Sequence, residues 1–318
     1  MDTTITGVSR LPEVSPAAVR KAAAGALGAL CLIVVTGAAV RLTQSGLGCP
    51  DWPMCSGSRL YPAWRYHAMI EFGNRLVTVG VVAAAAAALV AAWLRTPRRR
   101  DLVWLAAGAV GGVFAQAVLG GITVLVRLSP PWVMAHFLLS MVVIADAAVL
   151  YHRAGEPDGP TRPRVGPEMR QVSRALVVLT AVVLALGTAV TGAGPHSGST
   201  GVGRLGLSAR DAAELHSSAV MLLIGVTLAT LWLLRPAHAP ADVQRRGRTV
   251  LWVMAAQAGV GYTQYFTGVP AALVAVHVAG AVTVWLAVLR FHLSLVTRTP
   301  PADTVDGPAR SEPALVGA

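Results

Sequence analysis

Charged residues are scarce in this sequence. Only 13% of its 318 residues are Asp, Glu, Lys or Arg, whereas 54% are hydrophobic. This composition is typical of an integral membrane protein and excludes an ordinary soluble domain, which needs more polar residues to cover its surface. The first 20 residues also lack the apolar segment of a signal peptide, so we expect no cleavable signal.

Acidic residues are the scarcer charge: 15 Asp and Glu stand against 26 Lys and Arg, a formal net charge of +11. Such an excess can indicate nucleic-acid binding, but most of these basic residues lie in the two tails and in alternate segments between apolar runs, near 95–100, 153–174 and 235–248. That distribution follows the positive-inside rule. We therefore expect both termini in the cytoplasm, a location in the cell membrane, and no nucleic-acid partner.

Long apolar runs recur along the chain. A helix that crosses the hydrocarbon core needs roughly 20 apolar residues. Eight runs approach this length: about 22–40, 68–94, 102–126, 131–151, 175–193, 211–234, 249–267 and 270–292. We predict an all-α integral membrane protein with eight transmembrane helices. Four helices in each half place the halves parallel, which disfavours an inverted-repeat transporter.

The two halves of the sequence resemble each other. Gln116 and Gln257 each lie within Ala-Gln-Ala, and a histidine follows each of them after 20 residues, His136 and His277. Val-Thr-Gly-Ala also occurs twice, and each copy is followed by a polar cluster, EFGNR in the first half and ELHSS in the second. The sequence therefore predicts two parallel four-helix bundles related by a pseudo-twofold axis.

The expected boundaries follow the repeat. They are an N-terminal cytoplasmic tail at 1–21, a first half at 22–152, a cytoplasmic linker at 153–174, a second half at 175–292 and a disordered cytoplasmic tail at 293–318. The linker is rich in Pro, Gly and Arg, which favours a loop.

Cysteine is rare, with three in the chain. Cys49 and Cys55 lie six residues apart in a predicted outer loop, where the compartment is oxidising, so a disulfide is the favoured interpretation over free thiols or a metal pair. Cys31 lies within the first apolar run, and we expect it to be a packing residue.

Several polar residues lie within or beside the apolar runs. Glu71, Asn74 and Arg75 share one helix face at the start of the second run. Ionisable groups at membrane depth are costly and indicate function, although an interfacial Glu–Arg pair that only ends the span is the alternative. His67 is expected in the interface. Asp146 fits a proton relay or a helix–helix hydrogen bond, and it stays unassigned.

Three histidines, His136, His216 and His277, lie near the outer ends of apolar runs. A lone histidine in such a run is usually a packing residue, but three at matched depth indicate binding of iron porphyrin. His216 and His277 fit a bis-imidazole haem in the second half. The counterpart of His216 in the first half is Asn74, which is not a useful iron ligand. We therefore expect one saturated iron and one open site. His196, in an outer loop, stays unassigned.

Together these motifs resemble the haem A synthase family. The segments that carry the resemblance are VTGAAVRLTQSGLGCPDWPMC (35–55), IEFGNR (70–75), AQAVLGGITV with His136, VTGAGPHSG (190–198) with His216, and AQAGVG with His277. The resemblance implies oxidation of a methyl group of haem O to a formyl group by successive hydroxylations, during cofactor biosynthesis for cytochrome oxidase.

The resemblance also implies roles for individual residues. His216 and His277 look like ligands of a haem b cofactor, and His136 looks like an axial ligand of the substrate haem. Glu71 resembles the family's functional glutamate, and Cys49 and Cys55 resemble its outer-loop pair. Haem O synthase, terminal-oxidase assembly proteins and membrane lipid are the implied partners, with homo-oligomerisation as an option and the haem sites near the outer face.

The chain departs from the family pattern at Asn74. Much of the family has histidine there, so the sequence resembles an actinobacterial-like bacterial form with Glu-x-x-Asn-Arg. Asn74, Arg75 and His67 are therefore accessory candidates, and His67 could replace the missing histidine only if the helix start bends inward.

Two other functions compete with this interpretation. A di-haem b-type membrane electron carrier or quinone oxidoreductase would hold two fully ligated haems and alter neither. A non-haem transporter or assembly factor would use the histidines as hydrogen-bond partners between helices.

Overall fold

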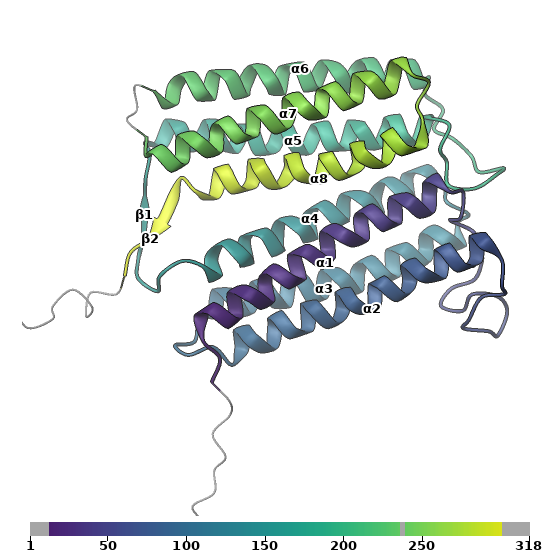
Figure 1. Ribbon diagram of the computed structural model, residues 1–318, viewed down its shortest axis with the longest axis horizontal. Helices are drawn as coiled ribbons and strands as arrows, with labels where there is room; N and C mark the ends of the chain where they lie inside the picture. The colour runs from purple at the N-terminus through teal and green to yellow at the C-terminus, as the bar shows by residue number, and fades with distance from the viewer. Residues whose placement is uncertain (1–12, 236–238, 301–318) are drawn as a thin grey trace, which may run out of the picture.

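Eight helices make up most of the computed structural model, which describes residues 13–235 and 239–300, and they run side by side along one axis (Figure 1). They are α1 (Pro16–Leu42), α2 (Tyr66–Trp93), α3 (Arg100–Leu125), α4 (Pro130–Ala154), α5 (Pro167–Ala193), α6 (Ala209–Leu234), α7 (Ala241–Phe266) and α8 (Ala271–Leu293). Each covers one of the eight predicted runs, and the all-α class is confirmed.

The helix starts follow local chemistry. Ser15 precedes α1, and its side chain accepts a hydrogen bond from the Ala18 N–H at 3.3 Å. Ser208 caps α6 in the same way through the Asp211 N–H. These serines satisfy backbone donors that the first turn of a helix leaves free. α6 begins at Ala209, two residues before the predicted apolar run at 211–234.

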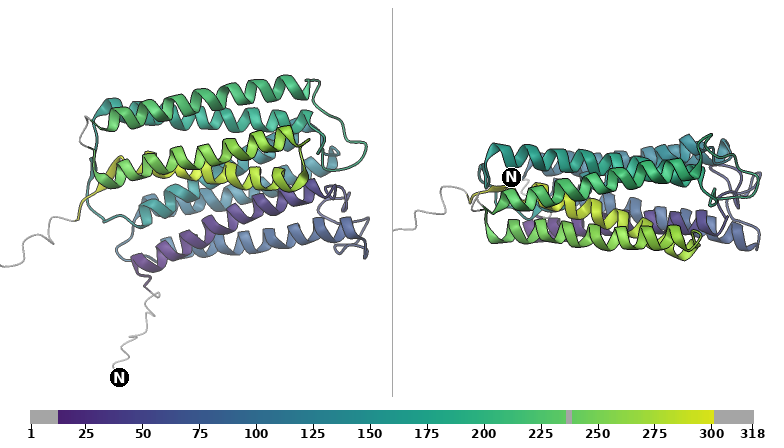
Figure 2. Two further views of the ribbon diagram at one scale, coloured as in Figure 1. Left: turned by 45° about the horizontal axis from the view of Figure 1, so that its top comes forward. Right: turned by 90° about the horizontal axis from the view of Figure 1, so that it is seen from above.

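Seven of the eight helices are long and apolar enough to cross a membrane, and α7 is the exception among the described helices. The expectation of eight apolar spans is therefore met for seven. Arg245, Arg246 and Arg248 lie in the first turns of α7, and the rest of the helix carries two glutamines and two tyrosines, which lower its mean hydropathy. The chain is a multi-pass membrane protein, and α7 lies alongside α6 and α8 (Figure 2).

The helices pack as antiparallel pairs. The strongest pairings are α1 with α2, α3 with α4, α5 with α6, and α7 with α8. Helices α1, α4, α5 and α8 meet where the first four helices face the last four. Trp285 of α8 donates a hydrogen bond to the Met141 carbonyl of α4 at 2.9 Å across this seam. Leu30, Ile144 and Val282 are buried in the same cluster.

A short β-ladder connects segments that the sequence did not predict to be ordered. β1 (Thr161–Pro163) pairs antiparallel with β2 (Val296–Arg298). β1 lies in the predicted loop at 153–174, and β2 lies in the tail expected to be disordered. Arg164 fixes the position by donating to both carboxylate oxygens of Asp242, at 2.9 and 2.6 Å. Residues 1–12 and 301–318, the rest of both predicted tails, lie outside the described residues.

Candidate functional site

Each of the three candidate histidines faces a glycine on the helix paired with its own. A Cβ added at that glycine would lie 3.0 to 3.2 Å from the imidazole Cε1. The pairs are Gly120 with His136, Gly187 with His216, and Gly261 with His277. Because a side chain would press on the ring, the glycines let the Cε1 edge of each imidazole approach the neighbouring backbone. The Nδ1 atom of each ring is buried and has no hydrogen-bond partner among the described residues.

A glutamine supports two of these histidines in the same way. Gln116 donates from Nε2 to the His136 carbonyl at 3.0 Å, and Gln257 donates to the His277 carbonyl at 2.8 Å. Gln116 also donates to the Ser140 hydroxyl at 2.8 Å. These bonds fix α3 against α4 and α7 against α8 at the level of the histidines. The glutamines of the two Ala-Gln-Ala motifs therefore make the same contact, each with the carbonyl of the histidine on the paired helix.

His216 and His277 lie together in the second half. Their ring centroids are 6.5 Å apart, and the ring planes are inclined by 71°. Two imidazoles that bind one metal ion from opposite sides, each with about 2 Å between nitrogen and metal, have centroids roughly 6 Å apart. The pair therefore fits one iron ion between the rings.

In the first half, His136 of α4 is the half-buried candidate histidine. His136 forms no ring pair with another imidazole in the part of the chain that the structure describes. Asn74 accepts a hydrogen bond from the Thr36 hydroxyl at 2.8 Å, which ties α2 to α1. His67 lies at the exposed start of α2, where its Nδ1 contacts the Ser45 hydroxyl at 3.0 Å.

Glu71 is a buried carboxylate, 6% exposed, that contacts a neighbour on α2 and also holds the loop between α1 and α2. One oxygen accepts from the Cys49 N–H at 2.7 Å, and the other accepts from Arg75 at 2.9 Å. Arg75 in turn donates to four loop carbonyls, those of Cys49, Asp51, Pro53 and Met54. The Glu–Arg pair predicted from the spacing is therefore present, and it joins the helix to the loop.

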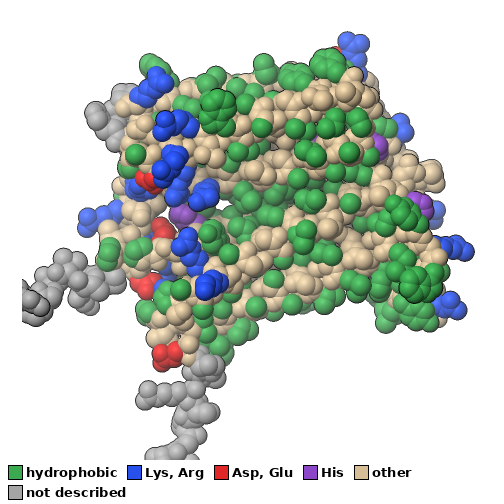
Figure 3. All heavy atoms as spheres, in the orientation of Figure 1, with side chains coloured by type: hydrophobic (Ala, Val, Ile, Leu, Met, Phe, Trp, Pro, Cys, Tyr) green, Lys and Arg blue, Asp and Glu red, His purple; other side chains and the backbone are tan. Residues whose placement is uncertain are grey.

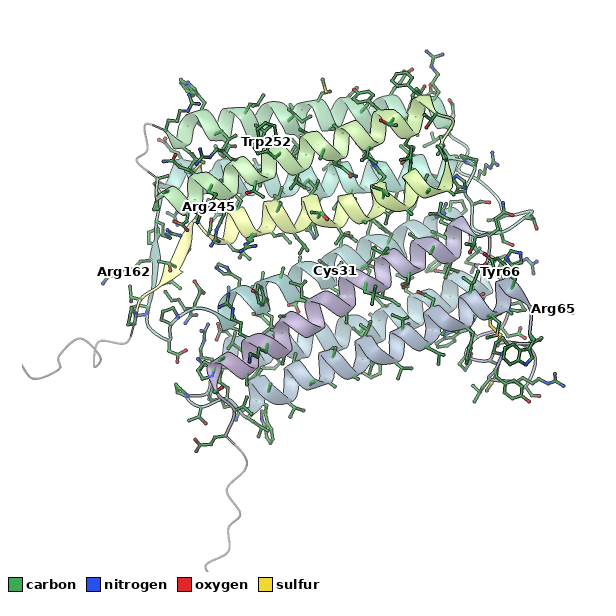
Figure 4. All side chains as sticks on the ribbon, in the orientation of Figure 1. Cys31, Arg65, Tyr66, Arg162, Arg245 and Trp252 are labelled. Atoms are coloured by element: carbon green, nitrogen blue, oxygen red, sulfur yellow. A yellow bond between two sulfur atoms is a disulfide. The ribbon has the colours of Figure 1, made fainter. Side chains whose placement is uncertain are left out.

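Cys49 and Cys55 form a disulfide within this loop, which confirms the favoured pairing. Trp52 lies between them, and its indole packs on Gly121 of α3 so closely that a side chain at Gly121 would overlap it. Gly121 is the neighbour of Gly120, which faces His136. The loop that Glu71 and Arg75 hold thus covers α3 beside the His136 site. Cys31 is a free, half-buried cysteine on α1 (Figure 4).

Sequence reasoning missed the contacts that join the two halves where α1 and α5 end. Arg41, at the end of α1, donates to the Thr191 carbonyl at 2.9 Å and to the His196 carbonyl. The His196 ring contacts the Val269 carbonyl at 2.9 Å. The basic residue that ends the first VTGAAVR motif was the available signal, but its acceptors are backbone atoms more than 100 residues away.

Asp146 and Glu214, the acidic residue of the second-half polar cluster, lie in different environments. Asp146 packs against Gly108 of α3, and its Oδ2 is buried without a partner among the described residues. Glu214, in the polar cluster that resembles the one around Glu71, is exposed and pairs with Arg210 at 2.8 Å. Only the first-half glutamate is therefore buried beside a candidate site.

Replacing Gly187 by valine is expected to displace the His216 ring, because its Cβ would lie 3.2 Å from the imidazole Cε1. Forcing a side chain off its rotamer costs about 0.5–1.5 kcal/mol, or roughly 2- to 10-fold in affinity. The measurement is the haem content of the purified protein. Gly225→Val is the control, since a Cβ at Gly225 on α6 meets nothing within 4 Å. Equal haem content in both variants would contradict the close approach at Gly187.

Comparison with known proteins identifies the family. A family model described as cytochrome oxidase assembly protein (COX15-CtaA) matches residues 20–196. The haem A synthase of Symbiobacterium thermophilum is 30% identical over 254 residues, which cover 73% of this chain and 80% of that protein. The haem A synthase of Bacillus licheniformis is 30% identical over 168 residues, 51% of this chain and 55% of that protein. The chain therefore belongs to the COX15-CtaA family of cytochrome oxidase assembly proteins, the family of the haem A synthases.

Proposed function

We propose that the second half of the chain holds haem b through His216 and His277 and that the first half presents His136 to haem O, the substrate. One asymmetry carries this proposal. The ring centroids of His216 and His277 are 6.5 Å apart, whereas His136 has no second imidazole beside it in the described residues. An iron ion with two protein ligands suits electron transfer, and one with a single ligand leaves a face open.

Family membership makes the chain a haem A synthase, an oxidoreductase that serves cytochrome oxidase assembly. We propose that it oxidises a methyl group of haem O to a formyl group by two successive hydroxylations followed by loss of water. Haem b, when bound, supplies electron transfer. The chain itself binds and orients the two porphyrins and accepts the protons that the methyl group loses.

We assign the catalytic proton acceptor to Glu71. Its carboxylate is buried and oriented by two donors, the Cys49 N–H and Arg75. The same loop carries Trp52, which packs on Gly121 next to the glycine that faces His136. This series of contacts supports a position for Glu71 beside the substrate. Arg75 acts as a positioning residue, because it holds both Glu71 and the loop carbonyls.

Asn74 takes a structural role in this proposal. Its side-chain oxygen is occupied by the Thr36 hydroxyl at 2.8 Å, so it helps to hold α2 on α1 at the depth where a second ligand would lie. His67 is exposed and bonded to Ser45, which favours an interfacial role over iron binding. The substrate haem is then held by one histidine, which corresponds to an Asn-containing form of the family.

The proposed architecture is two parallel four-helix bundles, α1–α4 and α5–α8, related by a pseudo-twofold axis. The matched Gln–His–Gly contacts of α3 and α4 and of α7 and α8 support it. We include α7 as the eighth span and place both termini in the cytoplasm. Lys and Arg side chains gather mostly at the end of the molecule that carries β1 and β2 (Figure 3), which agrees with the positive-inside rule. Haem O synthase and terminal-oxidase assembly proteins are the proposed partners in this membrane.

Extraction and mass analysis of the bound porphyrins tests the function. Protein purified from cells that make haem is expected to carry about one haem b per chain, and haem A is expected to form when haem O is supplied. A di-haem electron carrier would instead hold two haem b groups and leave haem O unaltered. Haem-free protein from haem-replete cells would contradict both functions and favour the transporter or assembly factor.

A further inference from the structure

A groove lies between α6 and α7 on the membrane-facing surface, toward the end of the bundle that carries β1 and β2. Its volume is about 320 Å³. Apolar side chains from both helices line it, and two arginines lie with them: Leu228, Leu231, Trp232, Leu251, Trp252, Arg235 and Arg248. In Figure 4, Trp252 lies beside α6, and Arg245 lies nearer the first turns of α7.

The groove follows from the way the two helices pack. α6 packs mainly on α5, and α7 packs mainly on α8, so α6 and α7 touch each other along a narrow line. At one point on that line Gly247 lets Leu231 and Leu234 approach, at 2.9 and 3.3 Å from where its Cβ would lie. Further along, the Thr227 hydroxyl contacts the Met254 sulfur at 3.5 Å. Side chains on either side of this line do not pack against each other, and the groove lies beside the line.

The walls of the groove are exposed apolar surface. Trp232 is 68% exposed and Trp252 is 72% exposed, and Leu228 is 50% exposed. Tryptophan is enriched where a membrane protein meets the headgroup region, because its ring is apolar and its N–H is polar. The groove is therefore an apolar surface that begins at headgroup depth and continues toward the hydrocarbon.

The charges at the end of the groove have no counterion among the described residues. Arg235 and Arg248 are exposed and form no ion pair within residues 13–235 and 239–300. The carboxylate of Asp242, in the first turn of α7, is already held by Arg164 through two short bonds. Both arginines also line the adjoining hollow, where Gln244 donates from its Nε2 to the Ala239 carbonyl at 2.9 Å. Two guanidinium groups that line one hollow can bind an oxyanion.

We propose that this groove binds an anionic phospholipid, with one acyl chain along the leucine and tryptophan walls and the phosphate at Arg235 and Arg248. A free anion would satisfy the arginines and leave the apolar walls unused. A transmembrane helix of a partner would cover the walls and leave two unpaired cations. A zwitterionic lipid would bring its own cation beside the guanidinium groups. Basic pockets between helices at this level of a membrane favour anionic headgroups.

This site is separate from the proposed haem chemistry. His216 and Gly261 lie toward the outer ends of α6 and α7, whereas the groove lies toward the opposite ends. Binding of lipid in the groove can therefore be measured whether or not the haem assignment holds.

The test uses the full chain as purified, stripped of lipid in detergent, with binding measured by native mass spectrometry. Dioleoylphosphatidylglycerol is expected to bind saturably, and dioleoylphosphatidylcholine is expected to bind at least tenfold more weakly. Two interfacial arginines contribute roughly 30-fold in affinity, so Arg235→Gln/Arg248→Gln should lose about that much. Arg174→Gln/Arg245→Gln is the control, because it removes the same charge from two exposed arginines outside the groove.

A second variant tests the apolar walls without changing charge. Leu228→Trp fills the groove at an exposed position, so the fold should survive and binding of the anionic lipid should fall. The proposal is overturned by equal loss in the arginine pair and its control, by equal binding of the two lipids, or by full competition from millimolar inorganic phosphate, which would indicate a free-anion site.

Discussion

The His277→Ala protein is expected to lose its haem b. His277 and His216 lie with their ring centroids 6.5 Å apart, so removal of either imidazole leaves a proposed iron ion with one ligand from the chain. Removing a residue that only orients a metal ligand costs about 10- to 100-fold in affinity. Loss of the ligand itself should cost more, and the purified variant should therefore contain little haem b. The measurement is the haem b content per chain, by absorbance and by extraction.

Two histidine variants serve as matched controls for this result. His136→Ala removes a buried imidazole from the other half and should keep haem b while losing the bound substrate haem. His67→Ala removes an exposed imidazole that contacts the Ser45 hydroxyl and the Tyr66 ring, and this variant should keep both haems. Unchanged haem b in His216→Ala and His277→Ala would remove the second-half assignment. Loss of substrate haem in His67→Ala would instead restore His67 as the missing ligand.

The helices could be predicted from sequence because each depends on a local pattern. An apolar run of spanning length determines a helix whatever lies around it, and the run at Ala271–Leu293 was located to within one residue at each end. The proximity of His216 and His277 does not follow from a local pattern. It was expected from their matched depth in two apolar runs, and the 6.5 Å between their ring centroids agrees with that expectation.

Contacts between distant backbone segments left no comparable signal. β1 and β2 have three residues each and pair across more than 130 residues, so neither shows the alternation that identifies a strand. Arg41 binds carbonyl groups, which every residue carries, so the sequence does not show its acceptors. The glycines that face the histidines were visible only as generic small residues, because their role depends on which helix lies opposite.

The Glu71→Gln protein is expected to keep its haem b and to make little haem A. The substitution keeps the shape of the side chain and its oxygen for the Cys49 N–H, but it removes the carboxylate that is proposed to accept protons from the substrate. General acid–base catalysis by one positioned side chain contributes about 10²- to 10⁴-fold in rate. The measurement is haem A formed per supplied haem O, together with the bound haem b.

A purely structural role for Glu71 makes a different prediction, because the same carboxylate also holds Arg75 and the loop. Arg75→Gln removes a donor to four loop carbonyls and leaves the carboxylate in place, and Cys55→Ser opens the disulfide. If Glu71 acts only by shaping the loop, these variants should lose as much product as Glu71→Gln. If Glu71 accepts protons, Glu71→Gln should lose at least tenfold more haem A product than either loop variant. Arg75→Lys should then restore part of the product that Arg75→Gln loses. Wild-type product from Glu71→Gln would rule out the catalytic assignment, whatever the loop variants do.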